Sequence, residues 1–127
     1  MSGRMSRDKG AAAERELCRL LSDELGVTVR RNVDQARSGG ADCLELPGFA
    51  IEAKRREVLS RPAWWRQAVT QGLVVGAEPL VFYRQSRKPW RALITGVGGY
   101  RDVDWTQALD YIRDKLARLH GIYGAKA

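Results

Sequence analysis

Short apolar runs of strand length alternate in this chain with longer segments of helical periodicity. Clusters of Gly, Pro and polar residues separate the runs and mark turns or loops. The order of elements is α-β-β-β-α-β-β-α, which predicts one α/β domain over residues 1–127, with a mixed central β-sheet flanked by helices. The predicted helices cover residues 9–25, 60–75 and 105–119, and the predicted strands cover residues 27–31, 41–46, 49–54, 79–84 and 90–95.

Residues with special backbone preferences mark the ends of these elements. Gly26 is suited to cap the first helix, and Ser60 could cap the second, with Pro62 in its first turn. We expect the second helix to end near Val75. The remaining segments are a predicted flexible basic N-terminus at 1–8, loops at 32–40 and 96–102, and a frayed tail after residue 119.

The composition points to a polyanionic partner. Lys and Arg number 22 against 15 Asp and Glu, which gives a net charge of +7 and a pI near 9.9. Such an excess favours nucleic acid or an acidic membrane surface, although a solvated basic surface is the simpler alternative. No apolar run reaches the length needed to span a membrane, so we expect a protein of the cytoplasm without a membrane partner.

The two cysteines do not form a metal or disulfide framework. Cys18 and Cys43 lie far apart, no CxxC motif is present, and His120 is the single histidine. We expect both thiols to be buried as small apolar groups in a reducing compartment.

The first helix carries an acid on its apolar face. At 100° per residue, Glu14 projects onto the middle of this face, whereas Glu16 points the opposite way. An acid facing a core is costly unless it is paired or binds a metal. In the alternative interpretation Glu14 lies in the first turn, complements the helix dipole and reaches solvent. The apolar face consists of Leu17, Cys18, Leu21 and Leu25.

The predicted hairpin at 41–54 combines acids with a lysine. Glu52 and Lys54 are two residues apart on a strand, so both side chains leave the same face. Mg²⁺ prefers oxygen ligands, which the Glu52 carboxylate and the Ala53 backbone carbonyl offer. The Lys54 ammonium could then orient or deprotonate an attacking water, or stabilise a charged transition state. An ordinary solvated strand is the alternative.

Asp42 raises a question of register. A regular two-residue turn at Pro47-Gly48 would pair position 42 with position 53 and place Asp42 on the face opposite Glu52. A shared metal site therefore predicts an odd-length connection or a β-bulge in this hairpin.

The second helix offers two glutamines. Gln67 and Gln71 share one side, from which an amide could reach a nucleotide or a metal-bound water, or simply face solvent. The other side carries Ala68, Gly72 and Gly76 at small-xxx-small spacing, which predicts close backbone packing on the sheet.

Four segments together resemble the archaeal-type Holliday junction resolvases within the PD-(D/E)xK nuclease superfamily. They are KGAAAEREL at 9–17, VRR at 29–31, SGGAD at 38–42 and IEAK at 51–54. The element order also matches the αβββαβ core of that superfamily. The chain departs from it at Ala41, which replaces the Pro of the PD element, and beyond residue 57 it looks more like small nucleases carried by bacteriophages.

The resemblance implies a divalent-metal-dependent endodeoxyribonuclease. Glu14, Asp42 and Glu52 would surround Mg²⁺ or Mn²⁺, and Lys54 would be the catalytic lysine. The implied substrate is a four-way DNA junction, cut by a homodimer that matches its near-twofold symmetry. A non-catalytic DNA-binding module on the same fold, or a nuclease for flaps, nicks or specific duplex sequences, remains an alternative.

The resemblance and the charge pattern also predict a DNA-binding surface around the metal site. Arg15 and Arg31 would contact the scissile phosphate or the DNA backbone, and Ser38 lies where family members often carry a functional serine. We expect the dimer face at Trp64, Trp65 or the last helix. Further candidates for DNA contact are Lys9, Arg30, Arg37, Arg55 and Arg56, with Lys88 and the stacking surface of Trp90 in RQSRKPWR at 84–91.

Overall fold

The computed structural model describes the backbone of residues 3–31 and 44–124, and the side chains of residues 10–31 and 46–120. The helices are α1 (Gly3–Leu25), α3 (Arg61–Val75) and α4 (Trp105–Gly124). The strands are β1 (Arg30–Arg31), β2 (Leu44–Leu46), β3 (Phe49–Arg55), β4 (Glu78–Arg84), β5 (Arg91–Gly96) and β6 (Gly99–Asp104).

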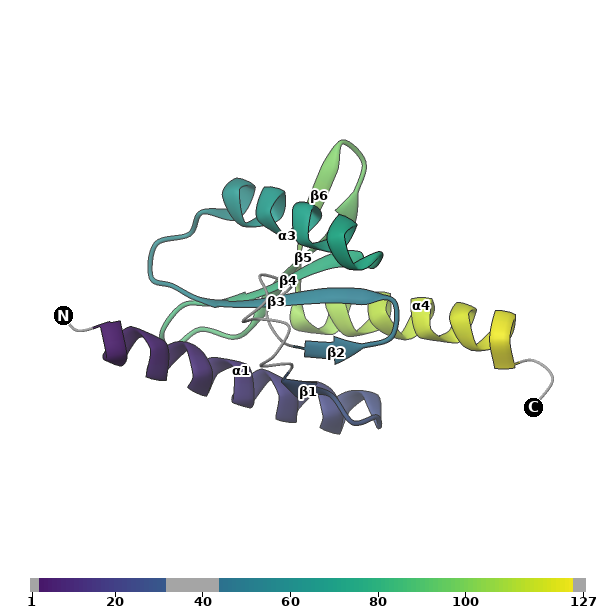
Figure 1. Cartoon of the computed structure of the whole chain (residues 1–127), viewed down its shortest axis with the longest axis horizontal. Helices are drawn as coiled ribbons and strands as arrows, with labels where there is room; N and C mark the ends of the chain where they lie inside the picture. The colour runs from purple at the N-terminus through teal and green to yellow at the C-terminus, as the bar shows by residue number, and fades with distance from the viewer. Residues whose placement is uncertain (1–2, 32–43, 125–127) are drawn as a thin grey trace.

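The strands form one mixed sheet in the order β1-β2-β3-β4-β5-β6 (Figure 1). β3 and β4 are parallel because α3 crosses over between them, and the other neighbours are antiparallel. This arrangement confirms the predicted α/β fold with helices around a mixed sheet. Within the described part of the chain, no helix is both long and apolar enough to cross a membrane.

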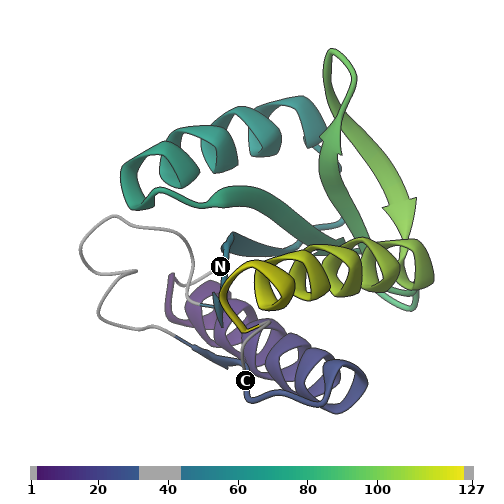
Figure 2. The same cartoon turned by 90° about the vertical axis from the view of Figure 1, so that its right-hand side faces the viewer.

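The helices divide between the two faces of the sheet (Figure 2). Helices α1 and α4 pack on one face, where Leu17 and Ile112 join Ile51 and Phe82 in the larger core cluster. Helix α3 covers the other face with a smaller cluster. Because strand residues alternate between faces, β4 and β5 contribute to both clusters. The smaller cluster consists of Trp64, Trp65, Ala68, Val81, Tyr83 and Leu93.

Several predicted boundaries are wrong. Helix α1 begins at Gly3, so most of the segment predicted to be flexible is helical, and α4 continues to Gly124. The segment predicted as a loop at 96–102 contributes strand β6, joined to β5 by a tight turn in which Gly98 has a positive φ of 77°. The glycines that suggested a loop therefore mark a hairpin turn.

The second helix begins and ends where the sequence predicts. Gly76 caps α3 in the left-handed conformation, with a φ of 70°. At its start Ser60 occupies the N-cap position and Pro62 lies in the first turn, as predicted, but the Ser60 side chain makes no capping hydrogen bond. Gly72 confirms the close packing, because a Cβ there would lie 2.6 Å from the Ala77 carbonyl oxygen.

The hairpin of β2 and β3 is regular in the described residues. Leu44 pairs with Ile51 and Leu46 with Phe49 around the two-residue turn, in which Gly48 has a φ of 83°. The predicted irregularity is therefore absent from positions 44–51. A bulge that turns Asp42 toward Glu52 would have to lie before Leu44, and both Asp42 and Cys43 are outside the described residues.

Candidate active site

Strand β3 carries two charged side chains into the interior under α3. Glu52 is 2% exposed and Lys54 is 8% exposed, and both leave the face opposite Ile51. Their register partners on β4 are Val81 and Tyr83, which belong to the α3 cluster. The predicted shared face of Glu52 and Lys54 is therefore confirmed, and the pair is buried rather than solvated.

Helix α3 reaches the lysine through a glutamine. Lys54 Nζ donates a hydrogen bond to Gln67 Oε1 at 3.1 Å. Gln71 lies one turn further along the helix, and its buried Oε1 has no hydrogen-bond partner among the described residues. Gln67 is itself exposed, so it faces solvent, as the alternative has it, and also bonds the buried lysine.

Glu14 is held by an arginine from β1. Arg31 donates to Glu14 Oε1 from Nε at 3.0 Å, and its NH2 lies 2.7 Å from the same oxygen. The side chain of Glu14 is 14% exposed. Because α1 begins at Gly3, Glu14 is not in the first turn, and the alternative based on the helix dipole is wrong.

Glu14 and Glu52 start from opposite faces of the sheet, since α1 packs against the Ile51 face of β3. A common metal ion requires them to meet around the edge of β3. Among the described strands, β2 pairs with β3 only as far as Ile51, so that edge has no described strand neighbour from Glu52 onward. Among the side chains that the structure describes, those of residues 10–31 and 46–120, no three His, Cys, Asp or Glu residues gather closely enough to hold a metal.

The donor chemistry nevertheless fits a hard divalent cation. Glu52 supplies a buried carboxylate beside the Ala53 carbonyl, and Glu14 supplies a second, largely buried carboxylate. Oxygen donors of this kind are the ligands that Mg²⁺ and Mn²⁺ prefer. Asp42, Arg37 and Ser38 lie outside the described residues.

The other residues predicted to contact DNA differ in their exposure and in the face of the sheet on which they lie. Arg15, Arg30 and Arg56 are exposed, as a phosphate contact requires. Arg55 follows Lys54 on β3 and therefore turns toward the opposite face, where its charge acts on Glu16. Lys9 lies in α1, and its side chain is outside the described residues.

The segment 84–91 differs from its predicted role. Trp90 is 5% exposed and donates its indole N–H to Glu16 at 2.7 Å, so it offers no stacking surface. Glu16 also binds Arg84 and is therefore not simply solvent-facing. Burial acts to raise the pKa of Glu16, but the bonds from Trp90 and Arg84 hold it below its usual range. Lys88 and Arg87 remain exposed.

The predicted aromatic dimer face is also wrong. Trp64 and Trp65 are 7% and 8% exposed, and each packs against a tyrosine within the monomer. Cys18, by contrast, is buried as predicted, and burial raises the pKa of its thiol to about 11.

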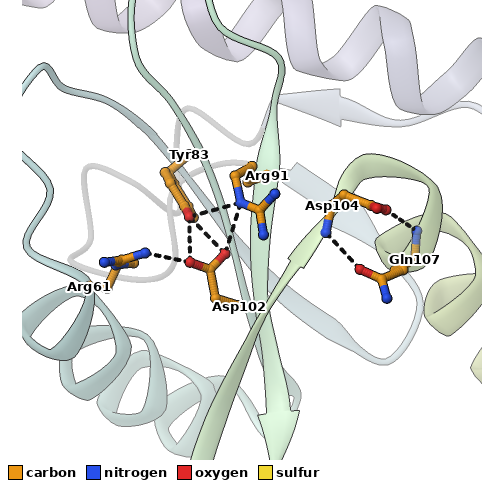
Figure 3. Close-up of polar contacts among 6 residues, drawn as sticks. All are labelled: Arg61, Tyr83, Arg91, Asp102, Asp104 and Gln107. Carbon is orange, nitrogen blue, oxygen red and sulfur yellow. Dashed lines mark hydrogen bonds and ion pairs between the residues drawn. The ribbon is translucent and has the colours of Figure 1, made fainter.

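A polar cluster that the sequence did not suggest lies on the α3 face (Figure 3). Asp102 accepts hydrogen bonds from Tyr83 at 2.7 Å, from Arg61 at 2.6 Å and from Arg91 at 3.1 Å. Burial acts to raise the pKa of Asp102, but the bonds from Tyr83 and Arg61 hold it below its usual range. The cluster depends on β6, which was predicted as a loop. The signal that could have found this strand is the spacing of Tyr100, Asp102 and Asp104 at every second position, which places them on one face of a strand.

Comparisons with known proteins place this chain in a family. A family model described as "Phage putative PDDEXK endonuclease" matches residues 5–101. Among solved structures, the chain is similar to Hjc, a Holliday junction resolvase from the archaeal hyperthermophile Archaeoglobus fulgidus. The two are 25% identical, the match covers 77% of this chain and 85% of that one, and the TM-score is 0.49. A search of curated proteins gives no match. The family match confirms the predicted superfamily: this chain belongs to a phage family of PD-(D/E)xK endonucleases.

Proposed function

We propose that this chain is a divalent-metal-dependent endodeoxyribonuclease that hydrolyses phosphodiester bonds in branched DNA, with four-way junctions as its preferred substrate. The observation that carries the proposal is the buried pair of Glu52 and Lys54 on one face of β3, within a family of endonucleases. Burying a carboxylate and an ammonium costs free energy that an apolar pair would not cost. A role in chemistry explains why the strand keeps both charges.

The proposed metal ligands are the carboxylates of Glu52, Glu14 and Asp42, with the Ala53 carbonyl. A bound Mg²⁺ or Mn²⁺ ion would supply Lewis-acid polarisation of the phosphate and stabilise the charge that develops on it. Arg31 neutralises Glu14 in the structure described here. We infer that Arg31 moves from Glu14 to a DNA phosphate when the site is filled.

Lys54 would act on the attacking water or on the phosphoryl oxygen. An ammonium has three donor hydrogens, and one of them is engaged by Gln67 Oε1. That bond fixes the direction of Nζ and leaves donors for the reacting groups. The low exposure of Lys54 strengthens its interaction with developing negative charge, because water screens it less.

The DNA partner is supported by charge and by the family match. The net charge of +7 favours a polyanion, and Arg15, Arg30 and Arg56 stand exposed for phosphate contact. The preference for junctions, and the homodimer that would cut opposing strands, rest on the resemblance of the KGxxxERE and D…ExK motifs to the resolvases.

A Glu52→Gln variant tests the chemistry. Incubated with a synthetic four-way junction and Mg²⁺, it should cleave at least about 100-fold more slowly than wild type, because an electrostatic interaction in the transition state is lost. Asp110→Asn removes an exposed carboxylate from α4 and should cleave normally. Undiminished cleavage by Glu52→Gln would contradict the proposed site.

A substrate panel tests the preference. Wild-type protein should cleave the four-way junction faster than a flap, a nicked duplex or a linear duplex at equal concentration. Equal rates on all four would contradict junction specificity and leave the nuclease chemistry intact. If the protein binds these DNA substrates but cleaves none of them in the presence of any divalent ion, the alternative of a non-catalytic DNA-binding module is favoured.

A further inference from the structure

We propose that Arg61 and Arg91 form a second phosphate-binding site, which holds a phosphodiester of the DNA backbone away from the bond that is cut. The inference rests on the proposed function in one respect, that the ligand is DNA. It adds two residues that neither the motifs nor the family match assigns.

The site lies on the same sheet face as the candidate catalytic pair. Lys54 pairs with Tyr83 across β3 and β4, and Tyr83 pairs with Arg91 across β4 and β5. Directly paired residues share a face, so these side chains form one row across the sheet. Two strand spacings separate Lys54 from Arg91, a distance of about 9–10 Å. One DNA molecule can therefore reach both positions.

The two guanidinium groups are held in place and yet accessible. Asp102 binds Arg61 through NH1 and Arg91 through Nε, and their side chains are 41% and 42% exposed. Tyr83, which is 2% exposed, donates to Asp102 and accepts a bond from Arg91 Nε at 3.3 Å. Within the described residues, the terminal nitrogens of Arg91 make no hydrogen bond. Figure 3 shows both arginines converging on the carboxylate from different elements.

The cluster carries an excess of positive charge. One carboxylate faces two guanidinium groups, and Tyr83 stays neutral because burial, then its bond to Asp102, raises the pKa of its phenol. The start of α3 adds to this potential, since its first turn contains no acidic residue. An anion is the ligand that such a site attracts, and a guanidinium with free planar donors matches a phosphate.

A role in stability alone explains the cluster poorly. Half-exposed ion pairs contribute little to the stability of a protein. One arginine already satisfies the charge of Asp102, so the second is surplus for folding. The surplus is explained if Asp102 and Tyr83 hold both arginines ready for DNA.

The test measures binding rather than cleavage. The affinity of metal-free protein for a fluorescein-labelled four-way junction, and for a linear duplex, is followed by fluorescence anisotropy over a series of salt concentrations. Arg61→Gln and Arg91→Gln should each weaken binding about 5- to 10-fold and reduce the slope of log K against log salt by about 0.9. Arg118→Gln removes the same charge from an exposed position on α4, across the sheet, and should change neither quantity appreciably.

Unchanged affinity and slope in both variants would overturn the site, whatever happens to their melting temperatures. If Arg91→Gln fails to fold, as circular dichroism would show, Arg61→Gln decides alone, because Arg61 lies at the exposed start of α3. The two proposals fail separately. If the two variants show reduced slopes while the wild-type protein cuts no DNA, the nuclease is refuted and the phosphate site is kept. If the wild-type protein cuts DNA while the slopes of the variants are unchanged, the phosphate site is refuted and the nuclease is kept.

Discussion

The two faces of the sheet are used differently. The face toward α1 and α4 carries the larger apolar cluster, and polar groups such as Glu78 and Lys115 pair with one another beside it. The face toward α3 has a smaller apolar cluster with polar groups on either side of it. Glu52 and Lys54 lie on β3, and the arginines that bind Asp102 lie at α3 and β5.

The difference shows how one strand can serve two purposes. On β3, Phe49 and Ile51 pack into the larger core, whereas Glu52 and Lys54 point under α3. Alternation along a strand allows this division without any change of backbone. We infer that the α1 and α4 face carries most of the stability, and that the α3 face carries the Glu52 and Lys54 pair, which Glu14 would join from the other face.

Phe82→Ala tests the first half of this comparison and should have the largest effect. Phe82 is fully buried in the larger cluster and packs on Trp105, so its truncation leaves a cavity. We expect the free energy of unfolding to fall by about 3–5 kcal/mol in urea denaturation. Val97→Ala, at a fully exposed position, should stay within about 0.5 kcal/mol of wild type. A small effect of Phe82→Ala would contradict the assignment of stability to this face.

Lys54→Met tests the second half. It should lower the cleavage rate about 100- to 1,000-fold, because a charge that stabilises the transition state is removed. Its unfolding free energy should fall as well, because removing one charge of a buried pair leaves the other poorly compensated, so the cleavage rate is measured on the folded variant.

Lys115→Met is the matched control on the opposite face. Lys115 pairs with Glu78 at 2.7 Å, so its loss should lower stability while the cleavage rate of the folded protein remains normal. If Lys115→Met lost cleavage and Lys54→Met kept it, the proposed division between the faces would be reversed.

Local patterns predicted the parts of the fold that depend on local geometry. The shared face of Glu52 and Lys54 follows from a period of two, and the end of α3 follows from the conformational freedom of Gly76. The buried face of α1 follows in the same way from helical periodicity, because Leu17 and Leu21 are fully buried.

Partners distant in sequence could not be predicted in this way. The bond from Trp90 to Glu16 joins residues 74 positions apart, and the bond from Arg61 to Asp102 spans 41. Each depends on which strands become neighbours, which no local pattern specifies. The position of Asp42 likewise depends on the path of the chain before Leu44, so its role as a ligand stays a prediction.

Gly72→Ala tests how closely α3 must approach the sheet. A Cβ at Gly72 would lie 2.6 Å from a backbone oxygen, so the helix end or the turn before β4 must shift. We expect a loss of about 1–3 kcal/mol in unfolding free energy, as for other overpacked sites. Gly10→Ala, where the added Cβ meets nothing within 4 Å, is the control and should not destabilise the protein. An equal effect at both positions would contradict the close approach.

Gln67→Leu separates positioning from charge at Lys54. The variant keeps the lysine but removes the acceptor that fixes Nζ, so we expect about tenfold slower cleavage. The Kd for DNA, measured in the absence of metal, should stay near the wild-type value. A variant that lost binding instead would place Gln67 at the DNA surface.

The smallest expected effect is the loss of unfolding free energy at acid pH. A carboxyl group on each face of the sheet, Glu78 on one and Asp102 on the other, should contribute to it. Burial acts to raise the pKa of Glu78, but hydrogen bonds from Lys115 and Tyr111 hold it below its ordinary value of 4.5. A carboxyl group with a lowered pKa in the folded state stabilises the protein above its unfolded pKa, and this contribution disappears as the pH falls through the folded value. The difference in unfolding free energy between wild type and Glu78→Gln should therefore be largest near neutral pH and shrink below about pH 4.5.

Asp102→Asn should behave in the same way on the α3 face, because the pKa of Asp102 is also lowered. A constant difference for Glu78→Gln across this range would contradict the pairing with Lys115.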